Sequence, residues 1–263
     1  MTTEAPQRYF ATPALYDLMY ATTLADIPFH VELARHARGR ALEVGCGNGR
    51  VLIPCLEAGA EVDGIDRDET MLEDARRKLA ARGLRAQLTC DDMRGFILPH
   101  RYALVAIPFS TFLHNLTQQD QLATLYACRE HLEPGGRLVL VMFSPDPRRL
   151  LEHDGAARVI LDHPNPAAPG TVRVLDALLS DPVEQVSRVR RTVELLDASG
   201  AKTETYVMEF GMRWIWPAEM ELLLHAAGFR RIAAEGRTGY RDGFQPKRAV
   251  EARDVMVWTA WKD

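Results

Sequence analysis

The pattern of apolar and polar residues divides the chain into parts with different periods. From residue 41 to residue 143, short apolar runs alternate with stretches in which apolar residues recur every three or four positions. The short runs predict strands at 41–45, 61–66, 85–90, 102–108 and 137–143. The stretches with helical spacing predict helices at 12–37, 49–59, 68–82 and 117–132, the last with a cap formed by Thr117 and Asp120, and EPGG at 133–136 predicts a turn. Strands that are apolar throughout and separated by helices are typical of a parallel sheet covered on both faces.

Further along the chain, apolar residues alternate with polar ones. Residues 186–213 contain two alternating stretches separated by the turn-like segment DASGAK, which predicts an antiparallel hairpin. Residues 171–179 could add a third strand, and the proline-rich stretch 162–170 is expected to be a loop. The residues expected on the buried face of the hairpin include Tyr206, Met208, Phe210 and Met212. A helix at 217–228 and strands at 229–236 and 254–261 complete the pattern.

A glycine-rich turn follows the first strand of the alternating region, in the segment ALEVGCGNGRV. Its glycines are Gly45, Gly47 and Gly49. The dinucleotide fingerprint G-x-G-x-x-G would require a glycine where this chain has Arg50, and about 40 residues precede the strand. Both observations count against a nicotinamide dinucleotide. The turn could also be a tight connection with no ligand.

Acidic residues follow the next two predicted strands. Asp66 ends the second strand, 21 residues after Gly45, where a carboxylate can accept hydrogen bonds from ribose hydroxyls. Asp91 and Asp92 follow the third strand. Polar groups at the carboxyl ends of successive parallel strands favour an adenosine-bearing ligand. The alternatives are that Asp66 caps the helix at 68–82 and that Asp92 is an ordinary loop residue.

Five segments together resemble one enzyme family. The segments are ALEVGCGNGR, GIDRDETML, CDDMRGF, AIPFSTFLHNLT and LEPGGRLVLVMF. In this order they resemble the class I S-adenosylmethionine-dependent methyltransferases, and within them the bacterial small-molecule subgroup that includes amino-sugar N,N-dimethyltransferases and natural-product methyltransferases. The resemblance covers roughly residues 12–145 and 215–263.

The resemblance implies an α/β fold with a particular domain organisation. The expected core is a Rossmann-like seven-stranded methyltransferase sheet with helices on both faces, formed by residues 39–146 and 217–263. Residues 1–38 would form an N-terminal helical lid. Residues 147–216 would form an antiparallel β insertion that serves as a substrate cap or a dimer contact.

The resemblance also implies S-adenosylmethionine as the cofactor and S-adenosylhomocysteine as the product. Gly45, Gly47 and Gly49 would form the floor under the methionine part of the cofactor, and Asp66 would bind the ribose hydroxyls. The amino end of the helix predicted at 49–59 would offer free N–H groups to the cofactor's carboxylate.

The adenine end of the cofactor would meet residues from the second and third strands. The resemblance places Arg67 and Met71 beside the adenine. It places Asp92 on the adenine amino group, with the backbone of Met93 alongside. Further candidates for cofactor contacts are Glu43, Cys46, Asn48, Arg50, Asp91 and Ile107.

Tyr16 and Tyr20 resemble aromatic residues that such enzymes place over the methionine end. Tyr16 could also orient the acceptor, or it could be an ordinary residue on the apolar face of a helix. Two positions depart from the subgroup: Asn48, where it usually has threonine, and Asp91, where glycine is commoner.

His114 is the candidate general base. It follows the fourth strand and resembles a position at which the subgroup sometimes has a catalytic histidine; the alternative is a loop histidine near the start of the helix at 117. Because the sulfonium donor is already activated, the protein mainly aligns the reactants, and a base is needed only when the acceptor must lose a proton. The pair His153 and Asp154 is interpreted as a solvated helix end. Candidate substrate contacts are Phe109, Ser110, Arg213, Trp214 and Trp216, and the tryptophans could instead be interface residues.

The composition of the chain argues against several kinds of binding partner. The chain has 263 residues, a net charge of −4 and only short, dispersed arginine clusters, which argues against nucleic-acid binding. The four cysteines form no CxxC pair, so reduced thiols are expected and no metal site. The N-terminus lacks the pattern of a signal peptide and no apolar run reaches about 18 residues, so we expect a cytoplasmic protein without membrane contact.

The sequence therefore predicts methyl transfer to an N, O or aromatic C atom of a small molecule, in specialised metabolism. A homodimer could form through the antiparallel insertion. Two alternatives are an NAD(P)-dependent oxidoreductase and a methyltransferase-like subunit that only binds ligand. Arg50 argues against the first, and the intact glycines and Asp66 argue against the second.

Overall fold

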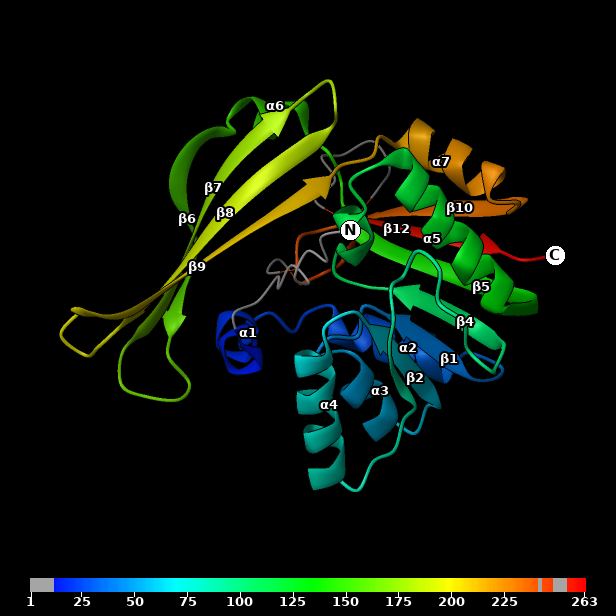
Figure 1. Cartoon of the computed structure of the whole chain (residues 1–263), viewed down its shortest axis with the longest axis horizontal. Helices are drawn as coiled ribbons and strands as arrows, with labels where there is room; N and C mark the ends of the chain where they lie inside the picture. The colour runs from blue at the N-terminus through cyan, green and yellow to red at the C-terminus, as the bar shows by residue number, and fades with distance from the viewer. Residues whose placement is uncertain (1–11, 241–242, 248–254) are drawn as a thin grey trace, which may run out of the picture. The chain divides into compact units, whose positions relative to one another are not determined.

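The computed structural model describes residues 12–240, 243–247 and 255–263, and Figure 1 labels most of their helices and strands. These residues form two compact units, one with an α/β sheet and one with an antiparallel sheet. In the described part of the chain, no helix is long and apolar enough to cross a membrane.

The two units are interleaved in the sequence. The core unit comprises residues 25–146 and 214–263. The inserted unit comprises residues 147–213 together with the N-terminal segment up to Leu24. The N-terminal segment expected as one helical stretch is therefore divided after Leu24: it contains α1 (Pro13–Tyr20) in the inserted unit and α2 (Ile27–Arg35) in the core unit.

The core unit contains an eight-stranded sheet with the order β11-β10-β12-β5-β4-β1-β2-β3. Its strands are Ala41–Val44 (β1), Val62–Asp66 (β2), Leu88–Cys90 (β3), Tyr102–Ile107 (β4), Leu132–Phe143 (β5), Arg231–Arg237 (β10), Pro246–Lys247 (β11) and Val255–Trp261 (β12). Neighbouring strands among β1 to β5 pair in parallel. Strand β12 is antiparallel to both β5 and β10. The predicted Rossmann-like α/β sheet is confirmed.

The sheet differs from the prediction in three details. It has eight strands instead of seven, because the two-residue strand β11 pairs with β10. Strand β5 begins at Leu132, so the predicted turn at 133–136 is an irregular part of this strand, where Gly135 has a φ of +75°. Strand β3 begins only at Leu88, three residues later than predicted.

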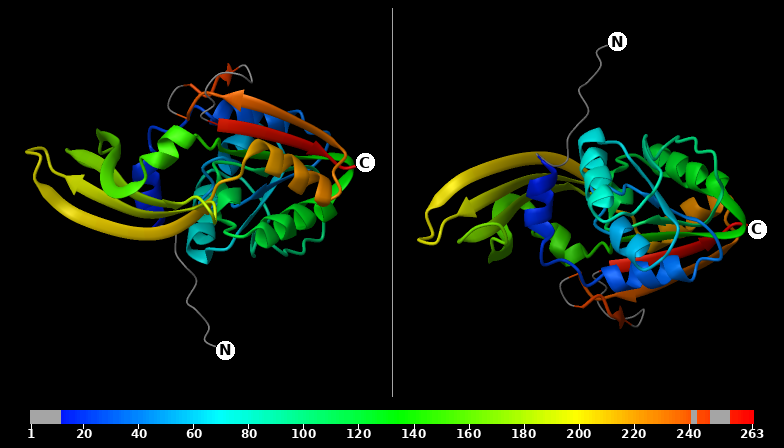
Figure 2. Two further views of the ribbon diagram at one scale, coloured as in Figure 1. Left: turned by 90° about the horizontal axis from the view of Figure 1, so that it is seen from above. Right: turned by 90° about the horizontal axis from the view of Figure 1, so that it is seen from below.

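Helices cover both faces of this sheet. Besides α2 they are Leu52–Glu57 (α3), Glu69–Ala81 (α4), Gln118–His131 (α5) and Pro217–Ala226 (α7), with a short 3₁₀ helix, η1, at Thr111–His114. Helices α5 and α7 lie on the opposite face of the sheet from α2 (Figure 2). Strand β1 is buried along its whole length, as expected for a strand between two helical layers.

Local sequence explains where two of these helices begin. The Thr117 hydroxyl accepts a hydrogen bond from the Asp120 backbone N–H at 3.0 Å and donates one to the Asp120 carboxylate at 2.9 Å, so the predicted cap of α5 is confirmed. Asp68 accepts from the Thr70 backbone N–H at 2.9 Å and caps α4. Helix α3 is shorter than the predicted 49–59, since residues 45–51 form a turn and only six residues are helical.

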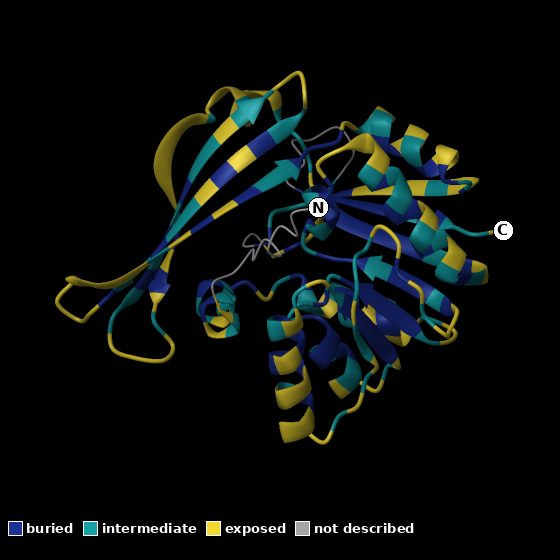
Figure 3. Cartoon of the chain, viewed as in Figure 1, coloured by how far each residue is buried: buried dark blue, intermediate teal, exposed yellow. Residues whose placement is uncertain are grey.

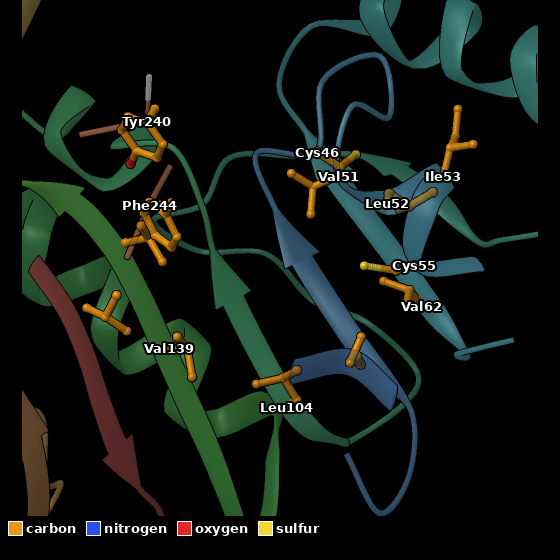
Figure 4. Packing of buried hydrophobic residues seen from close by; sticks show 14 of the residues in the cluster. Cys46, Val51, Leu52, Ile53, Cys55, Val62, Leu104, Val139, Tyr240 and Phe244 are labelled. Carbon is orange, nitrogen blue, oxygen red and sulfur yellow. The ribbon is translucent and has the colours of Figure 1, made fainter. Parts of the chain in front are cut away.

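Apolar side chains from β1, β2, β4, α3 and α4 form the main hydrophobic cluster of the core unit (Figure 4). Leu42, Leu52, Leu72 and Leu104 have almost no exposed surface. Burying a leucine side chain stabilises the native state by about 1.5–3 kcal/mol, and this packing fixes the strand ends that precede the glycine loop.

The inserted unit contains a four-stranded antiparallel sheet in the order β6-β7-β8-β9. Its strands are Asp154–Pro164 (β6), Thr171–Asp181 (β7), Val186–Leu196 (β8) and Lys202–Arg213 (β9), and α6 (Pro147–Leu151) precedes them. The predicted hairpin and third strand are confirmed. Strand β6 was not predicted, and it occupies the first part of the expected loop at 162–170.

One face of this sheet is buried against α1. Figure 3 shows buried and exposed positions alternating along β8 and β9. Met208 and Phe210 are buried, as the alternation predicts. Tyr206 packs against the hydrophobic cluster that contains Met208. Leu15 and Met19 of α1 belong to this cluster. The first half of β6 is mostly exposed, which explains why its sequence carries little apolar periodicity.

Candidate cofactor site

The glycine loop after β1 requires glycine for steric reasons. Gly45, Gly47 and Gly49 have φ angles of +75°, +52° and +89°, in the left-handed region that favours glycine. A Cβ atom on Gly45 would lie 2.3 Å from Cγ2 of Thr111, and one on Gly49 would lie 2.8 Å from Cδ1 of Ile53. The loop therefore packs closely against η1 on one side and α3 on the other.

Gly47 differs from the other two glycines. A Cβ atom there would lie 3.4 Å from Cε of Met71 and 3.9 Å from Oδ2 of Asp66, which are ordinary contact distances. The Gly47 backbone thus faces the two residues that the sequence assigns to the adenosine part of the cofactor. A single methyl group added at Gly47 would fill the space between the loop, Met71 and Asp66.

Asp66 joins the end of β2 to the glycine loop. Its Oδ2 atom accepts a hydrogen bond from the Gly47 N–H at 2.7 Å, and its Oδ1 atom accepts one from the Asp68 N–H at 2.9 Å. Burial raises the pKa of Asp66 above its usual value, and the two backbone hydrogen bonds oppose this shift. The residue that caps α4 is Asp68, so the alternative role of Asp66 as the cap is not supported.

The acids after β3 lie next to this strand end. The Asp91 N–H donates to the backbone carbonyl of Asp66 at 3.1 Å, and the Asp92 N–H donates to the Asp91 carboxylate at 2.8 Å. The Arg94 guanidinium binds both Asp92 oxygens, at 2.9 and 2.7 Å. This hydrogen bonding lowers the pKa of Asp92. The spacing of two residues between Asp92 and Arg94 is visible in the sequence and could have predicted this ion pair.

Met93 and Asn115 connect the turn after β3 with the end of η1. The Asn115 side-chain N–H donates to the Met93 sulfur at 3.5 Å and to the Phe112 carbonyl at 3.1 Å. Arg67 is exposed, and its backbone carbonyl accepts from the Cys90 thiol at 3.6 Å.

The side chains of Cys46 and Asn48 point into the protein. The Asn48 amide donates to Asp74 of α4 at 3.2 Å. A Cβ atom on Gly64 of β2 would lie 2.6 Å from the Cys46 sulfur, which shows how closely this thiol packs on the sheet. Burial raises the pKa of Cys46 well above its usual value, so its thiol stays protonated at neutral pH. Any cofactor contact of these two residues would involve their backbone.

A turn with unusual backbone geometry follows β4, whose last residue, Ile107, is fully buried. Phe109 and Ser110 have φ angles of +54° and +65°, a left-handed conformation that is uncommon for residues other than glycine. Ser110 is 2% exposed: its N–H donates to the Val141 carbonyl at 2.8 Å, and its hydroxyl accepts from the Phe143 N–H at 3.0 Å. The strained turn is therefore anchored to β5.

The same turn leads into η1, which presses Thr111 against Gly45. Phe112 and Leu113 are buried, and His114, the last residue of η1, is partly exposed. The fold thus places His114 at the end of a segment that contacts the glycine loop directly. Thr111 was not among the predicted site residues, because nothing in the local sequence reports its distance from Gly45.

Arg50 and Glu43 lie on either side of the loop. Arg50 binds Asp26, a residue that the sequence did not single out, through two hydrogen bonds. Glu43 on β1 is almost completely buried, and burial raises its pKa to about 8, while the charge of Arg50 opposes the shift.

Three predicted site residues belong to the inserted unit. Tyr20 accepts a hydrogen bond from Arg191 at 2.7 Å, and its ring centroid lies 4.8 Å from that of Tyr16. Arg213, at the end of β9, is buried and donates to Gln185 at 3.3 Å. Their contacts with a cofactor or an acceptor stay predictions.

Trp214 and Trp216 belong to the core unit. Trp214 is buried, whereas Trp216, which precedes α7, is 37% exposed. His153 and Asp154, which the sequence presents as a pair, lie in the inserted unit. His153 forms a hydrogen bond with Ser180 through Nδ1 at 2.6 Å, and Asp154 forms an ion pair with Arg158 at 2.8 Å. The described geometry thus gives each of these two residues a separate partner.

Comparison with known proteins finds similarity to methyltransferases. A family model described as a methyltransferase domain matches residues 41–136. The chain is 31% identical over 133 residues to dTDP-3-amino-3,4,6-trideoxy-alpha-D-glucopyranose N,N-dimethyltransferase of Streptomyces venezuelae, covering 48% of this chain and 54% of that protein. It is 36% identical over 122 residues to demethylmenaquinone methyltransferase of Thermus thermophilus, covering 45% and 54%. The chain thus spans about half the length of the curated relatives it matches.

A solved structure resembles the chain over a longer range. The CcbJ methyltransferase from Streptomyces caelestis superposes with a TM-score of 0.71 at 25% identity, covering 91% of this chain and 96% of that one. The match includes both the α/β sheet and regions beyond the family model. The chain therefore carries a methyltransferase domain at residues 41–136 and has the Rossmann-like fold of the class I S-adenosylmethionine-dependent methyltransferases.

Proposed function

We propose that this protein transfers a methyl group from S-adenosylmethionine to a small-molecule acceptor in specialised metabolism. The observation that carries the proposal is the hydrogen bond of 2.7 Å between the Gly47 N–H and the Asp66 carboxylate, inside the methyltransferase domain. It joins the loop that would hold the methionine part of the cofactor to the acid that would hold its ribose.

The residues present fit this cofactor. The open side of Gly47, between Met71 and Asp66, is a place where a side chain would take the room of a ligand. In the proposed complex, Asp66 accepts hydrogen bonds from the ribose hydroxyls and Met71 packs against the adenine. Asp92 then lies near the adenine amino group, with its charge balanced by Arg94. When bound, the cofactor supplies a methyl group on a positively charged sulfur, which is already an activated donor.

One expected contact is not part of the proposal. The sequence assigned the cofactor's carboxylate to the N-terminus of a helix at 49–59, but α3 begins at Leu52 and has six residues. The N–H groups of Gly45, Cys46, Gly47 and Gly49 already donate hydrogen bonds within the protein, so we assign no partner to this carboxylate.

The acceptor that we favour is an amino group on a sugar. Support comes from the relative in Streptomyces venezuelae, whose name describes an N,N-dimethyltransferase of a dTDP-amino sugar. A second relative is named demethylmenaquinone methyltransferase, which is not an amino-sugar enzyme by its name, so other acceptor atoms stay alternatives. An amine is protonated at neutral pH and must lose a proton before it attacks the methyl group. We propose that His114 is the general base that accepts this proton.

The remaining assignments concern the acceptor and the assembly. We propose Phe109, Trp214 and Trp216 as acceptor contacts from the core unit. We propose Tyr16 and Arg213 as contacts from the inserted unit. A homodimer through the inserted unit and a cytoplasmic location are further predictions of the sequence.

Calorimetry tests the cofactor. We expect binding of S-adenosylmethionine and S-adenosylhomocysteine, and a large loss of affinity for both in Asp66→Ala. Asp68→Ala, which removes the cap of α4 two residues away, is the matched control and should keep most of the affinity. Binding of NAD(P) with no response to either sulfur ligand would overturn the proposal. Binding without turnover on a panel of amino sugars, quinols and phenols would favour a non-catalytic subunit.

A further inference from the structure

The core unit contains a small cavity between α2 and β1. Its volume is about 20 Å³. Its walls include Ala34 of α2, Val51 and Cys55 near α3, and Leu104 of β4, and Figure 4 shows the last three in the apolar cluster. A cavity needs about 10–15 Å³ to hold one water molecule, so this one has room for a single water and for no organic ligand.

Two polar side chains line this otherwise apolar cavity. His30 of α2 is 3% exposed, and Glu43 of β1 is 4% exposed. Among the described residues, neither ring nitrogen of His30 has a hydrogen-bond partner. The nearest acid, Asp26, lies 3.8 Å from Nε2, beyond hydrogen-bond distance, and it is already bound to Arg50. Buried ring nitrogens without a partner are uncommon, because each loses its hydrogen bond to water on folding.

The charge states of the two groups favour a neutral bridge. Burial lowers the pKa of His30 to about 4, an effect reinforced by Arg50 and Arg237 and opposed by Asp26. The imidazole is therefore neutral at pH 7, with one N–H donor and one acceptor nitrogen. Burial raises the pKa of Glu43 to about 8, with Asp66 and Asp26 acting in the same direction and Arg50 against it. The thiols of Cys46 and Cys55 also face Glu43, and both stay protonated.

We propose that this cavity binds one water molecule, which links the imidazole of His30 to the carboxyl group of Glu43. In the neutral state the Glu43 hydroxyl donates to the water oxygen, and the water donates to the acceptor nitrogen of His30. When Glu43 loses its proton to the solvent, the same water turns and donates to the carboxylate. His30 is thus a positioning residue for Glu43, at the strand that leads into the glycine loop.

The bridge gives the proposed cofactor site a dependence on pH, a consequence that rests on the proposed function. A cation bound at the glycine loop favours the charged form of a nearby carboxyl group. Binding of the positively charged cofactor would then release a proton from Glu43 below its pKa. S-adenosylhomocysteine lacks the sulfonium charge and would release less.

A high-resolution crystal structure of the whole protein tests the water directly. We expect one ordered water within 3.2 Å of a His30 ring nitrogen and of a Glu43 carboxyl oxygen, the ordinary range for such bonds. A dry cavity, or a water that contacts neither side chain, would overturn the proposal.

The titration of Glu43, followed by carbon-13 NMR of its carboxyl group, tests the link to His30. In His30→Leu we expect its midpoint to rise by about one pH unit or more, because the carboxylate loses a hydrogen bond that favours the charged form. Val62→Ala enlarges the cavity at an apolar wall and keeps both polar groups, so its midpoint should stay at the wild-type value. Equal shifts in both variants would overturn the role of His30. If His30→Leu does not fold, His30→Gln serves instead, with a smaller rise.

Calorimetry in two buffers of different ionisation enthalpy counts the protons released on binding. We expect release with S-adenosylmethionine at pH 7, and none in Glu43→Gln. Release that is unchanged in Glu43→Gln would overturn the coupling to this residue. If the cofactor does not bind at all, the proposed function fails, while the crystallographic water and the Glu43 titration still decide whether the bridge exists.

Discussion

Arg50 and Asp26 form a two-point ion pair that ties the glycine loop to the turn before α2. Nη1 lies 2.9 Å from Oδ1 and Nη2 lies 2.7 Å from Oδ2, and the Asp26 side chain is fully buried. The guanidinium carbon also lies 4.2 Å from the centre of the Phe109 ring. The residue that breaks the dinucleotide fingerprint therefore holds three segments of the core unit together.

Removing this arginine should destabilise the protein strongly. In Arg50→Met the buried Asp26 carboxylate loses its partner, and we expect the free energy of unfolding to fall by about 3–5 kcal/mol. Urea denaturation measures the change. The matched control is Arg82→Met, which removes the half-exposed pair with Glu57 and should cost about 0–1 kcal/mol. Losses of similar size in both variants would show that the buried pair does not hold the loop.

The three alanine variants Gly45→Ala, Gly47→Ala and Gly83→Ala separate stability from binding. Gly83 has a φ of +67° and open space around it, so its variant reports backbone strain alone, about 1–2 kcal/mol. Gly47→Ala should lose a similar amount of stability but weaken S-adenosylmethionine binding about tenfold or more, because its methyl group enters the proposed site. Gly45→Ala should be the least stable of the three, since its Cβ would overlap Thr111.

Thermal denaturation and calorimetry together check these glycine variants. The key comparison is between Gly47→Ala and Gly83→Ala. If both keep wild-type cofactor affinity, the cofactor does not lie over Gly47.

Loss of His114 should affect turnover without affecting cofactor binding. If it removes the proton of the acceptor amine, His114→Ala should lower kcat by about 10²–10⁴-fold. Its affinity for S-adenosylmethionine should stay at the wild-type value. His36→Ala, at the exposed end of α2, is the control and should keep full turnover. Undiminished turnover in His114→Ala would remove this residue from the mechanism.

Glu43 should make the stability of the protein fall with rising pH. Burial raises its pKa from 4.5 to about 8, so between these values the native state holds a proton that the unfolded chain has lost. The free energy of unfolding then decreases with pH, by at most about 1.4 kcal/mol per pH unit. The lowered pKa of His30 has the opposite effect, but only between about 4 and 6.5.

Glu43→Gln isolates this contribution. Between pH 6.5 and 8 the variant should gain stability relative to the wild type as the pH rises, because glutamine has no proton to lose. Urea denaturation at several pH values in this window measures the difference. A difference that stays constant across the window would contradict the raised pKa.

The sequence predicted most of what depends on local pattern. The cap formed by Thr117 and Asp120 and the glycine turn are encoded by neighbouring residues, and the structure contains both. The alternation around Met208 and Phe210 likewise predicted a sheet with one buried face. Strand β6 was not predicted, because an exposed edge strand needs little apolar periodicity.

The parts of the candidate site that the sequence did not predict depend on contacts between residues far apart in the chain. Asp26 lies 24 residues before Arg50, and no local pattern links the two. The approach of Thr111 to Gly45 likewise arises only when β4 pairs with β1. Sequence periodicity predicts elements, whereas such pairs require the register between them.

The turn at Phe109 and Ser110 has a consequence for redesign of this protein. Because Ser110 is fastened to the backbone of β5, the start of η1 is positioned by the sheet and not by the residues that follow it. Exchange of the partly exposed His114 or the exposed Leu116 should therefore leave the start of η1 in place, whereas Leu113 and Asn115 are buried and hold its end. A library confined to these two positions would vary the surface at the end of η1 and leave the turn at Phe109 and Ser110 and the glycine loop unchanged.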